Sequence, residues 1–123
     1  MRRSRKRSPR RFAWSAGGLV WKQRSRTGPR HEERCSAAAF ETLVRAIQAR
    51  AQDGFTLLEL AQDGRRSMEE AAVTVNFLLE QGLLKPLGTR FFPVRRGLLG
   101  EARTALRALR ESSNSPPSLF DAL

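Results

Sequence analysis

Basic side chains are concentrated near the start of this 123-residue chain. Residues 1–34 contain twelve Arg and Lys residues against Glu32 and Glu33, a net charge of +10, whereas residues 35–123 contain eleven basic and ten acidic residues, a net charge of +1. We call residues 2–11 the cationic segment; its charges are Arg2, Arg3, Arg5, Lys6, Arg7, Arg10 and Arg11. Guanidinium groups at this density bind polyanions, so nucleic acid is the first candidate partner and an anionic membrane surface the second.

A second group of basic residues lies in the nearly neutral remainder of the chain. Arg65 and Arg66 precede a predicted helix, and four more flank a predicted hairpin: Lys85, Arg90, Arg95 and Arg96. We expect these side chains to contact phosphates, which position a protein on a nucleic acid but carry little sequence information. For any one of them, an ordinary solvated surface is the alternative.

The sequence lacks the combinations of residues that usually support catalysis or metal binding. The single His31 and the single Cys35 provide neither a zinc site nor an internal disulfide, which favours a reducing compartment. The run GLLGEAR lacks the Gly-Lys-Ser/Thr ending of a phosphate-binding loop, and no paired carboxylates or Ser/His/Asp arrangement is evident. We therefore expect a protein that is not an enzyme and needs no metal or cofactor.

The start of the chain is predicted to be a basic arm, residues 1–27, largely disordered when unbound. Phe12, Trp14, Leu19 and Trp21 alternate around AGG, which predicts a short hairpin over 12–21 or two extended segments docked on the body. The aromatic rings either clip the arm to the body or stack on unpaired bases. The run RRFAWSAGGLVW loosely resembles a twin-arginine signal but has no small-residue cleavage site, so we expect a cytoplasmic, nucleoid-associated protein.

The body, residues 28–111, shows helical periodicity and helix-capping signals. Pro29 suits the first turn of a helix ending near Asp53-Gly54, with Glu32 and Glu33 favourably placed for its dipole. Two capping boxes, Thr56 with Glu59 and Ser67 with Glu70, predict a short second helix and a third helix ending at Gln81. Two short strands are expected within residues 83–94, and a fourth helix follows from about residue 97. No apolar run approaches the roughly 20 residues that span a bilayer.

The stretch FTLLELAQDGRRSMEEAAVTVNFLLEQGLLKPLGTRFFPV resembles the winged helix-turn-helix domain shared by many prokaryotic regulators. The resemblance covers about residues 36–96, and the matching marks are the LLELA helix, the capped third helix, the LLEQGLL exit and the GTRFFPV strand. It implies a mainly α fold, in which a three-helix core with a small β-hairpin is followed by a C-terminal helix. It also implies DNA binding, with the third helix in the major groove and the hairpin near the backbone.

The third helix carries few groups able to read bases. Placing Ala71, Thr74, Val75 and Leu78 toward the core turns Glu70, Ala72, Val73, Asn76 and Phe77 outward, and among these only Asn76 is a usual base-reading type. Val73 and Phe77 then form a protein-interaction patch, unless the face assignment is shifted by one position and both belong to the core.

The leading hypothesis is a regulator or accessory factor that binds double-stranded DNA, rather than RNA, mainly through its arm. The alternative is a dimerisation or protein-interaction module tethered nonspecifically to DNA or RNA.

The end of the chain, residues 112–123, is expected to be a flexible tail. Its run SLFDAL resembles a short docking peptide of the kind that engages replication sliding clamps, and packing of Phe120 against the fourth helix is the alternative.

Overall fold

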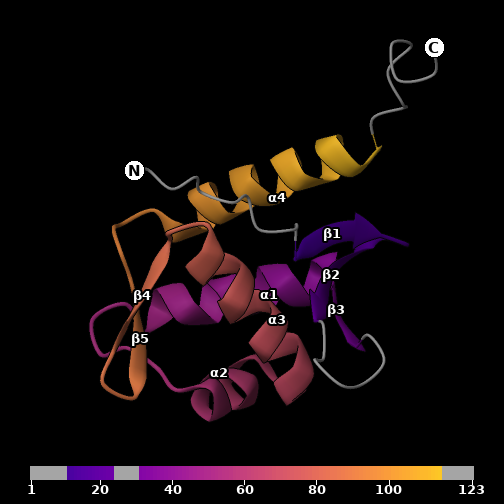
Figure 1. Ribbon diagram of the computed structural model, residues 1–123. Coiled ribbons are helices and arrows are strands. Elements are labelled where there is room, and N and C mark those ends of the chain that lie inside the picture. The colour runs from indigo at the N-terminus through magenta and orange to yellow at the C-terminus, as the bar shows by residue number, and fades with distance from the viewer. Residues whose placement is uncertain (1–10, 24–30, 115–123) are drawn as a thin grey trace, which may run out of the picture.

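The computed structural model describes residues 11–23 and 31–114, which form an α+β arrangement of two small antiparallel sheets and four helices (Figure 1). The elements run in the order β1 (Phe12–Ser15), β2 (Gly18–Gln23), β3 (His31–Ser36), α1 (Ala37–Ala49), α2 (Leu57–Gly64), α3 (Met68–Glu80), β4 (Leu84–Leu87), β5 (Arg90–Pro93) and α4 (Leu98–Asn114). The expectation of a mainly α fold, with a wing hairpin and a short hairpin over 12–21, therefore omitted β3, which extends the first hairpin to a three-stranded sheet.

That sheet has the order β1-β2-β3. The predicted hairpin is present: Phe12 lies opposite Trp21, and the turn between the strands uses positive φ angles of 52° at Ala16 and 76° at Gly17. Two adjacent positive φ angles match the right-handed twist of a hairpin. Because β2 then pairs with β3, strands on both sides of the expected boundary at residues 27 and 28 belong to the same sheet.

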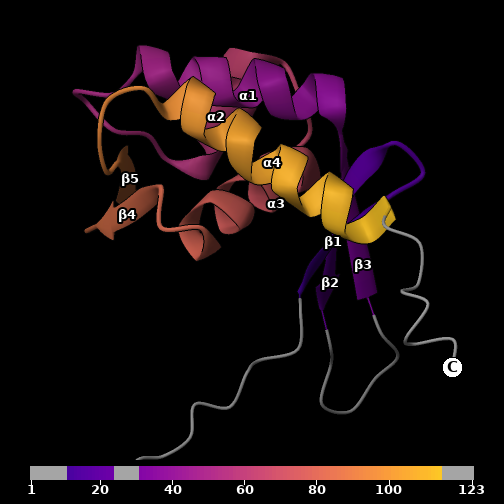
Figure 2. The ribbon, with the colours of Figure 1, turned by 90° about the horizontal axis from the view of Figure 1, so that it is seen from above.

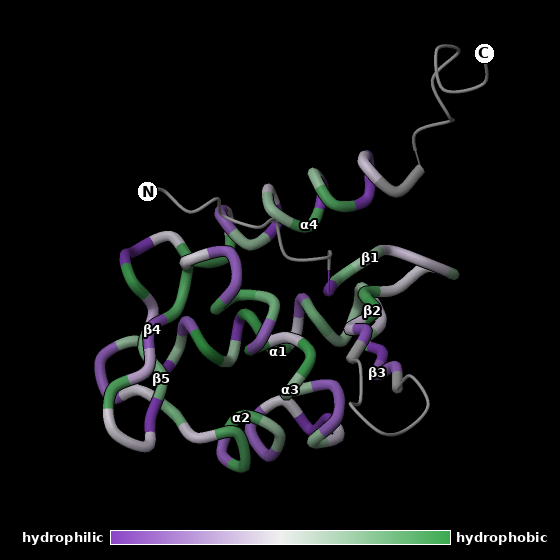
Figure 3. Tube along the Cα trace, viewed as in Figure 1, coloured by the Kyte–Doolittle hydropathy of each residue, from purple (hydrophilic) through white to green (hydrophobic). Residues whose placement is uncertain are grey.

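Strand β3 corrects the predicted start of the first helix at Pro29. Residues 31–36 are extended, and α1 begins only after Ser36, whose hydroxyl accepts a hydrogen bond from the Ala39 N–H at 3.1 Å. Glu32 and Glu33 consequently lie opposite Lys22 and Trp21 on β2 instead of at a helix N-terminus. Pairing with β2 decides this conformation, because β3 is a largely hydrophilic strand with no strong strand signal of its own (Figure 3).

The two predicted capping boxes are confirmed. Thr56 caps α2 and Ser67 caps α3, and in each case the glutamate three residues later accepts a hydrogen bond from the N–H of the cap residue. The reciprocal bonds satisfy N–H groups that a helix N-terminus leaves without partners.

Helix α3 contacts α1 and α2 and also the strands β2, β3 and β4. Val73 and Phe77 are both 0% exposed. The Phe77 ring centroid is 5.4 Å from that of Phe12 and 5.8 Å from that of Phe40. Of the two alternatives for these residues, the exposed patch is wrong and the assignment of both to the core is confirmed: Phe12 of β1 and Phe40 of α1 cover Phe77.

Helix α4 crosses the other helices and reaches β1 (Figure 2). Leu98 and Ala102 are buried against the core, and the Arg103 Nε donates to Glu41 on α1 at 3.1 Å. That hydrogen bond is the main reason that the pKa of Glu41 is lowered. No helix in the described part of the chain combines the length and apolar composition needed to cross a membrane.

Cys35 is a buried residue of β3, and its Sγ is 3.4 Å from the Oγ1 of Thr74 on α3. Burial raises the pKa of the Cys35 thiol from its ordinary value of 9.0 to about 11. The unfolded chain therefore loses this proton near pH 9, while the folded protein retains it until about pH 11, so the free energy of unfolding falls as the pH rises through this window.

We expect the wild type to lose about 2–3 kcal/mol of stability between pH 9 and pH 11 relative to Cys35→Ala, which has no thiol to ionise. Urea unfolding of both proteins across this pH range measures the difference. Parallel pH profiles for the two proteins would show that the folded thiol ionises normally.

Candidate nucleic-acid interface

The cationic segment joins the folded part of the chain at the start of β1. Arg11 is exposed, and its carbonyl accepts a hydrogen bond from the Lys22 N–H at 2.7 Å. Lys22 is also exposed, so two basic residues stand at this end of the sheet. The other six charges of the segment, from Arg2 to Arg10, lie outside the described residues.

The solvent-facing side of α3 lacks basic side chains. It presents Met68, Glu69, Ala72, Asn76 and Glu80. The Asn76 Nδ2 donates to the Ala72 carbonyl at 2.8 Å, so the amide expected to read bases is held against its own helix. The Glu69 carboxylate accepts from the Arg34 N–H of β3 at 3.0 Å, and this bond fastens the start of α3 to the sheet. This face offers a phosphate backbone no attractive charge.

Arg65 and Arg66 occupy the turn that leads into α3. Arg65 has a left-handed backbone with φ 54° and is exposed, while Arg66 is half-buried. Neither has an ion-pair partner among residues 11–23 and 31–114. Both guanidinium groups are therefore available to an anionic partner.

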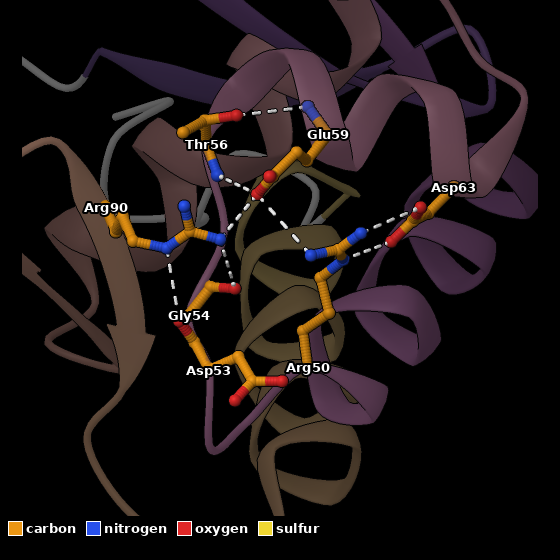
Figure 4. Close-up of polar contacts among 7 residues, drawn as sticks. All are labelled: Arg50, Asp53, Gly54, Thr56, Glu59, Asp63 and Arg90. Carbon is orange, nitrogen blue, oxygen red and sulfur yellow. Dashed lines mark hydrogen bonds and ion pairs between the residues drawn. The ribbon is translucent and has the colours of Figure 1, made fainter.

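Arg90, the first residue of β5, is turned toward the body (Figure 4). Its Nε donates to the Asp53 carbonyl at 3.1 Å, and its Nη2 donates to the Gly54 carbonyl at 3.3 Å and to the Glu59 Oε1 at 2.7 Å. Phe55 and Phe91 exchange two backbone hydrogen bonds of 3.1 and 2.8 Å beside these contacts. Arg90 thus fastens the β4–β5 hairpin to the α1–α2 loop, and its guanidinium is already hydrogen-bonded within the protein.

Glu59 is the centre of a small polar network at this point (Figure 4). One carboxylate oxygen accepts from the Thr56 N–H at 3.1 Å and lies 3.4 Å from the Arg50 Nη1, and Arg50 also pairs with Asp63. The network therefore joins the end of α1, both ends of α2 and the start of β5. Sequence reasoning identified only the capping role of Glu59; the pairing with two arginines depends on where the hairpin lies.

We expect Glu59→Ala to lower the free energy of unfolding by about 1–2 kcal/mol, because the N-cap loses its acceptor and two partly exposed arginines lose their shared partner. Glu59→Gln is the matched control, since glutamine also serves in a capping box while lacking the charge. Its cost should be smaller, and urea unfolding measures both. Equal losses in the two variants would show that the carboxylate charge, and not the cap, carries the effect.

Three further basic residues remain exposed at the β4–β5 hairpin: Lys85, Arg95 and Arg96. Arg95 approaches Glu101 at 3.5 Å in a solvent-exposed pair of little energetic weight. Lys85 and Arg96 have no ion pair within the described ranges. Lys85 lies on β4, two residues from Leu87, which is 63% exposed, whereas Arg95 and Arg96 follow the end of β5 at the other end of the hairpin.

The basic residues predicted from the sequence do not converge on one surface of the body. Figures 1 and 2 place β1, which follows Arg11, and the β4–β5 hairpin at opposite ends of the molecule. The turn between α2 and α3 lies on the side away from α4 (Figure 1). The exposed cations Lys22 and Arg34 were not among the predicted contact residues, because the pairing of β2 with β3 was not predicted. A lysine and an arginine on neighbouring strands are a signal only once the pairing is known.

The aromatic residues of the sheet are engaged in packing. Phe12 is stacked on Trp21 with ring centroids 5.9 Å apart and planes 10° apart, and the Arg110 guanidinium lies 4.8 Å from the ring centroid of Trp14. Both tryptophans are half-buried. This is the clip arrangement, in which the rings hold the strands to the helices.

Within residues 11–23 and 31–114, no three His, Cys, Asp or Glu side chains lie close enough together to hold a metal ion. The comparisons with protein-family models, curated proteins and solved structures found no match for this chain.

Proposed function

We propose that this chain is a small nucleic-acid-binding protein that acts on double-stranded DNA as a regulator or accessory factor, with most of its affinity supplied by the cationic segment. The observation that carries the proposal is the charge distribution: net +10 in residues 1–34 and net +1 in residues 35–123. A nearly neutral folded body has little general attraction for phosphates, so the segment dominates binding. A cytoplasmic, nucleoid-associated location belongs to the same proposal.

The folded body is proposed to be a winged helix-turn-helix domain with an added sheet. Its support is the order α1, α2, α3, β4, β5, together with the backbone bridge from Phe55, between α1 and α2, to Phe91 on β5. The body departs from that pattern at α3, where β2 and β3 cover one side and the remaining side carries Glu69 and Glu80. We infer binding with little sequence preference, oriented by Arg65, Arg66, Lys85, Arg95 and Arg96.

The alternative function, a protein-interaction module acting through Val73 and Phe77, loses the surface on which it depended. Both side chains are buried in the core of the same chain. Dimerisation through these two residues is therefore not proposed.

The proposal is tested by binding the full chain to two unrelated DNA duplexes, a single strand and a structured RNA over a salt series. With six or more phosphate contacts, duplex affinity should fall roughly 10³-fold between about 50 and 200 mM salt. The two duplexes should bind with similar affinity. Absence of binding at low salt rejects nucleic-acid binding, strong preference for one duplex rejects the lack of sequence reading, and tighter binding of the RNA rejects DNA as the main partner.

A further inference from the structure

A groove opens between the second half of α4, the end of α3 and the start of β1. Its volume is about 280 Å³, and the residues that line it include Phe12, Phe77, Ala105, Ala108, Leu109 and Ser112. Phe12 and Phe77 are only 3% and 0% exposed, so the accessible apolar lining of the groove comes mainly from Ala105, Ala108 and Leu109 of α4. Apolar surface in such a hollow lacks the packing contacts that it would have in a filled interior.

The small side chains of α4 account for the hollow. In its first half, Leu98 and Ala102 pack into the core, and Leu106 follows one turn later. Ala105 and Ala108 contribute only a methyl group each to the lining of the groove. The space is therefore wide enough for one large apolar side chain from elsewhere.

The segment that follows α4 in the sequence contains such a side chain, Phe120. Helix α4 ends at Asn114, two residues beyond Ser112, and the nine residues that follow are SPPSLFDAL. Phe120 is six residues beyond Asn114, a reach of roughly 20 Å for extended chain. The distance back along the helix from Asn114 to Ala108 is only about 9 Å. Pro116 and Pro117 cannot continue the helix, which allows the chain to turn back.

We propose that the C-terminal segment, residues 115–123, docks in this groove of its own chain, with Phe120 packed against Ala105, Ala108 and Leu109 of α4. The segment contains Leu119, Phe120 and Leu123 but no basic residue. Its acidic Asp121 has partners on α4, where Arg107 and Arg110 flank Ala108 and Leu109 in the sequence and are exposed. Glu80, which lines the α3 side of the groove, directs Asp121 toward α4 by repulsion.

The test uses the isotopically labelled full chain and nuclear magnetic resonance. Docking predicts nuclear Overhauser contacts between the Phe120 ring protons and the Ala105 and Ala108 methyl groups. Phe120→Ala should remove those contacts, shift both methyl resonances and lower the melting temperature by about 4 °C or more, because one aromatic side chain returns to water. Ser118→Ala, a change in the same segment without apolar burial, should leave all three readouts unchanged.

A second variant, Ala108→Leu, fills the groove from inside and should shift the Phe120 resonances to those of a solvent-exposed phenylalanine. The proposal is overturned if Phe120 shows no contact with either alanine and Phe120→Ala leaves the methyl resonances in place. Contacts that arise only between differently labelled copies in a mixed sample would overturn it as well, in favour of exchange between two chains. No nucleic acid enters these measurements, so their failure and the failure of the proposed function are distinguishable.

Discussion

Replacement of the seven basic side chains between Arg2 and Arg11 with glutamine is expected to lower the affinity for a DNA duplex by roughly 10²- to 10³-fold near 100 mM salt. Each phosphate contact contributes about 0.9 to the slope of log affinity against log salt. The variant should therefore show a much shallower slope as well as weaker binding. Fluorescence anisotropy with a labelled duplex across a salt series measures both quantities.

A matched control removes cations from the folded body. In a triple variant with Lys85→Gln, Arg95→Gln and Arg96→Gln, we expect a smaller loss of affinity than in the segment variant, of similar size for every duplex. The slope of log affinity against log salt should decrease by about 1 for each phosphate contact removed. These three side chains are exposed, so the fold should be unaffected. If the body variant loses more affinity than the segment variant, the hairpin and not the cationic segment is the main nucleic-acid contact.

Truncation of Phe77 is expected to destabilise the protein by about 3–5 kcal/mol, as for other buried phenylalanines changed to alanine. The Phe77 ring is fully buried and lies within 6 Å, between ring centroids, of the rings of Phe12 and Phe40, so its loss opens a cavity where the sheet, α1 and α3 meet. Urea unfolding followed by tryptophan fluorescence and circular dichroism reports the change. Such a loss is a large fraction of the total stability of a domain of this size.

Met68→Ala is the control on the same helix. Met68 is 47% exposed at the first turn of α3, and surface substitutions of this kind usually change stability by less than about 0.5 kcal/mol. Phe77→Ala with unchanged stability but a changed molecular mass in solution would indicate that Phe77 serves an interface after all.

Local signals in the sequence were sufficient for features that depend on a few neighbouring residues. The capping boxes at Thr56 and Ser67 fixed the starts of α2 and α3, since the groups that satisfy one another are three residues apart. The hairpin around Gly17 was predicted from the alternation of apolar residues on both sides of AGG. Each of these features depends on residues within about ten positions of one another.

Features that depend on distant pairing were not predictable in this way. HEERCS becomes a strand only because GLVWKQ lies beside it, and nothing in its own composition requires that conformation. The periodicity of α3 left open whether Val73 and Phe77 are exposed or buried, because it assumes one buried side, whereas α3 packs against both helices and strands. Likewise, the sequence gives no sign that Arg90 is directed toward Glu59 and away from a partner.

The enclosed position of α3 has a consequence for the order of folding during synthesis. Phe12 and Trp21 emerge from the ribosome early, yet the Phe77 ring against which Phe12 packs is translated much later. Until then the nascent strands expose two large aromatic rings next to a run of arginines. Contacts between such distant residues also slow folding, so we expect the amino-terminal strands to be the last to dock and the first to detach.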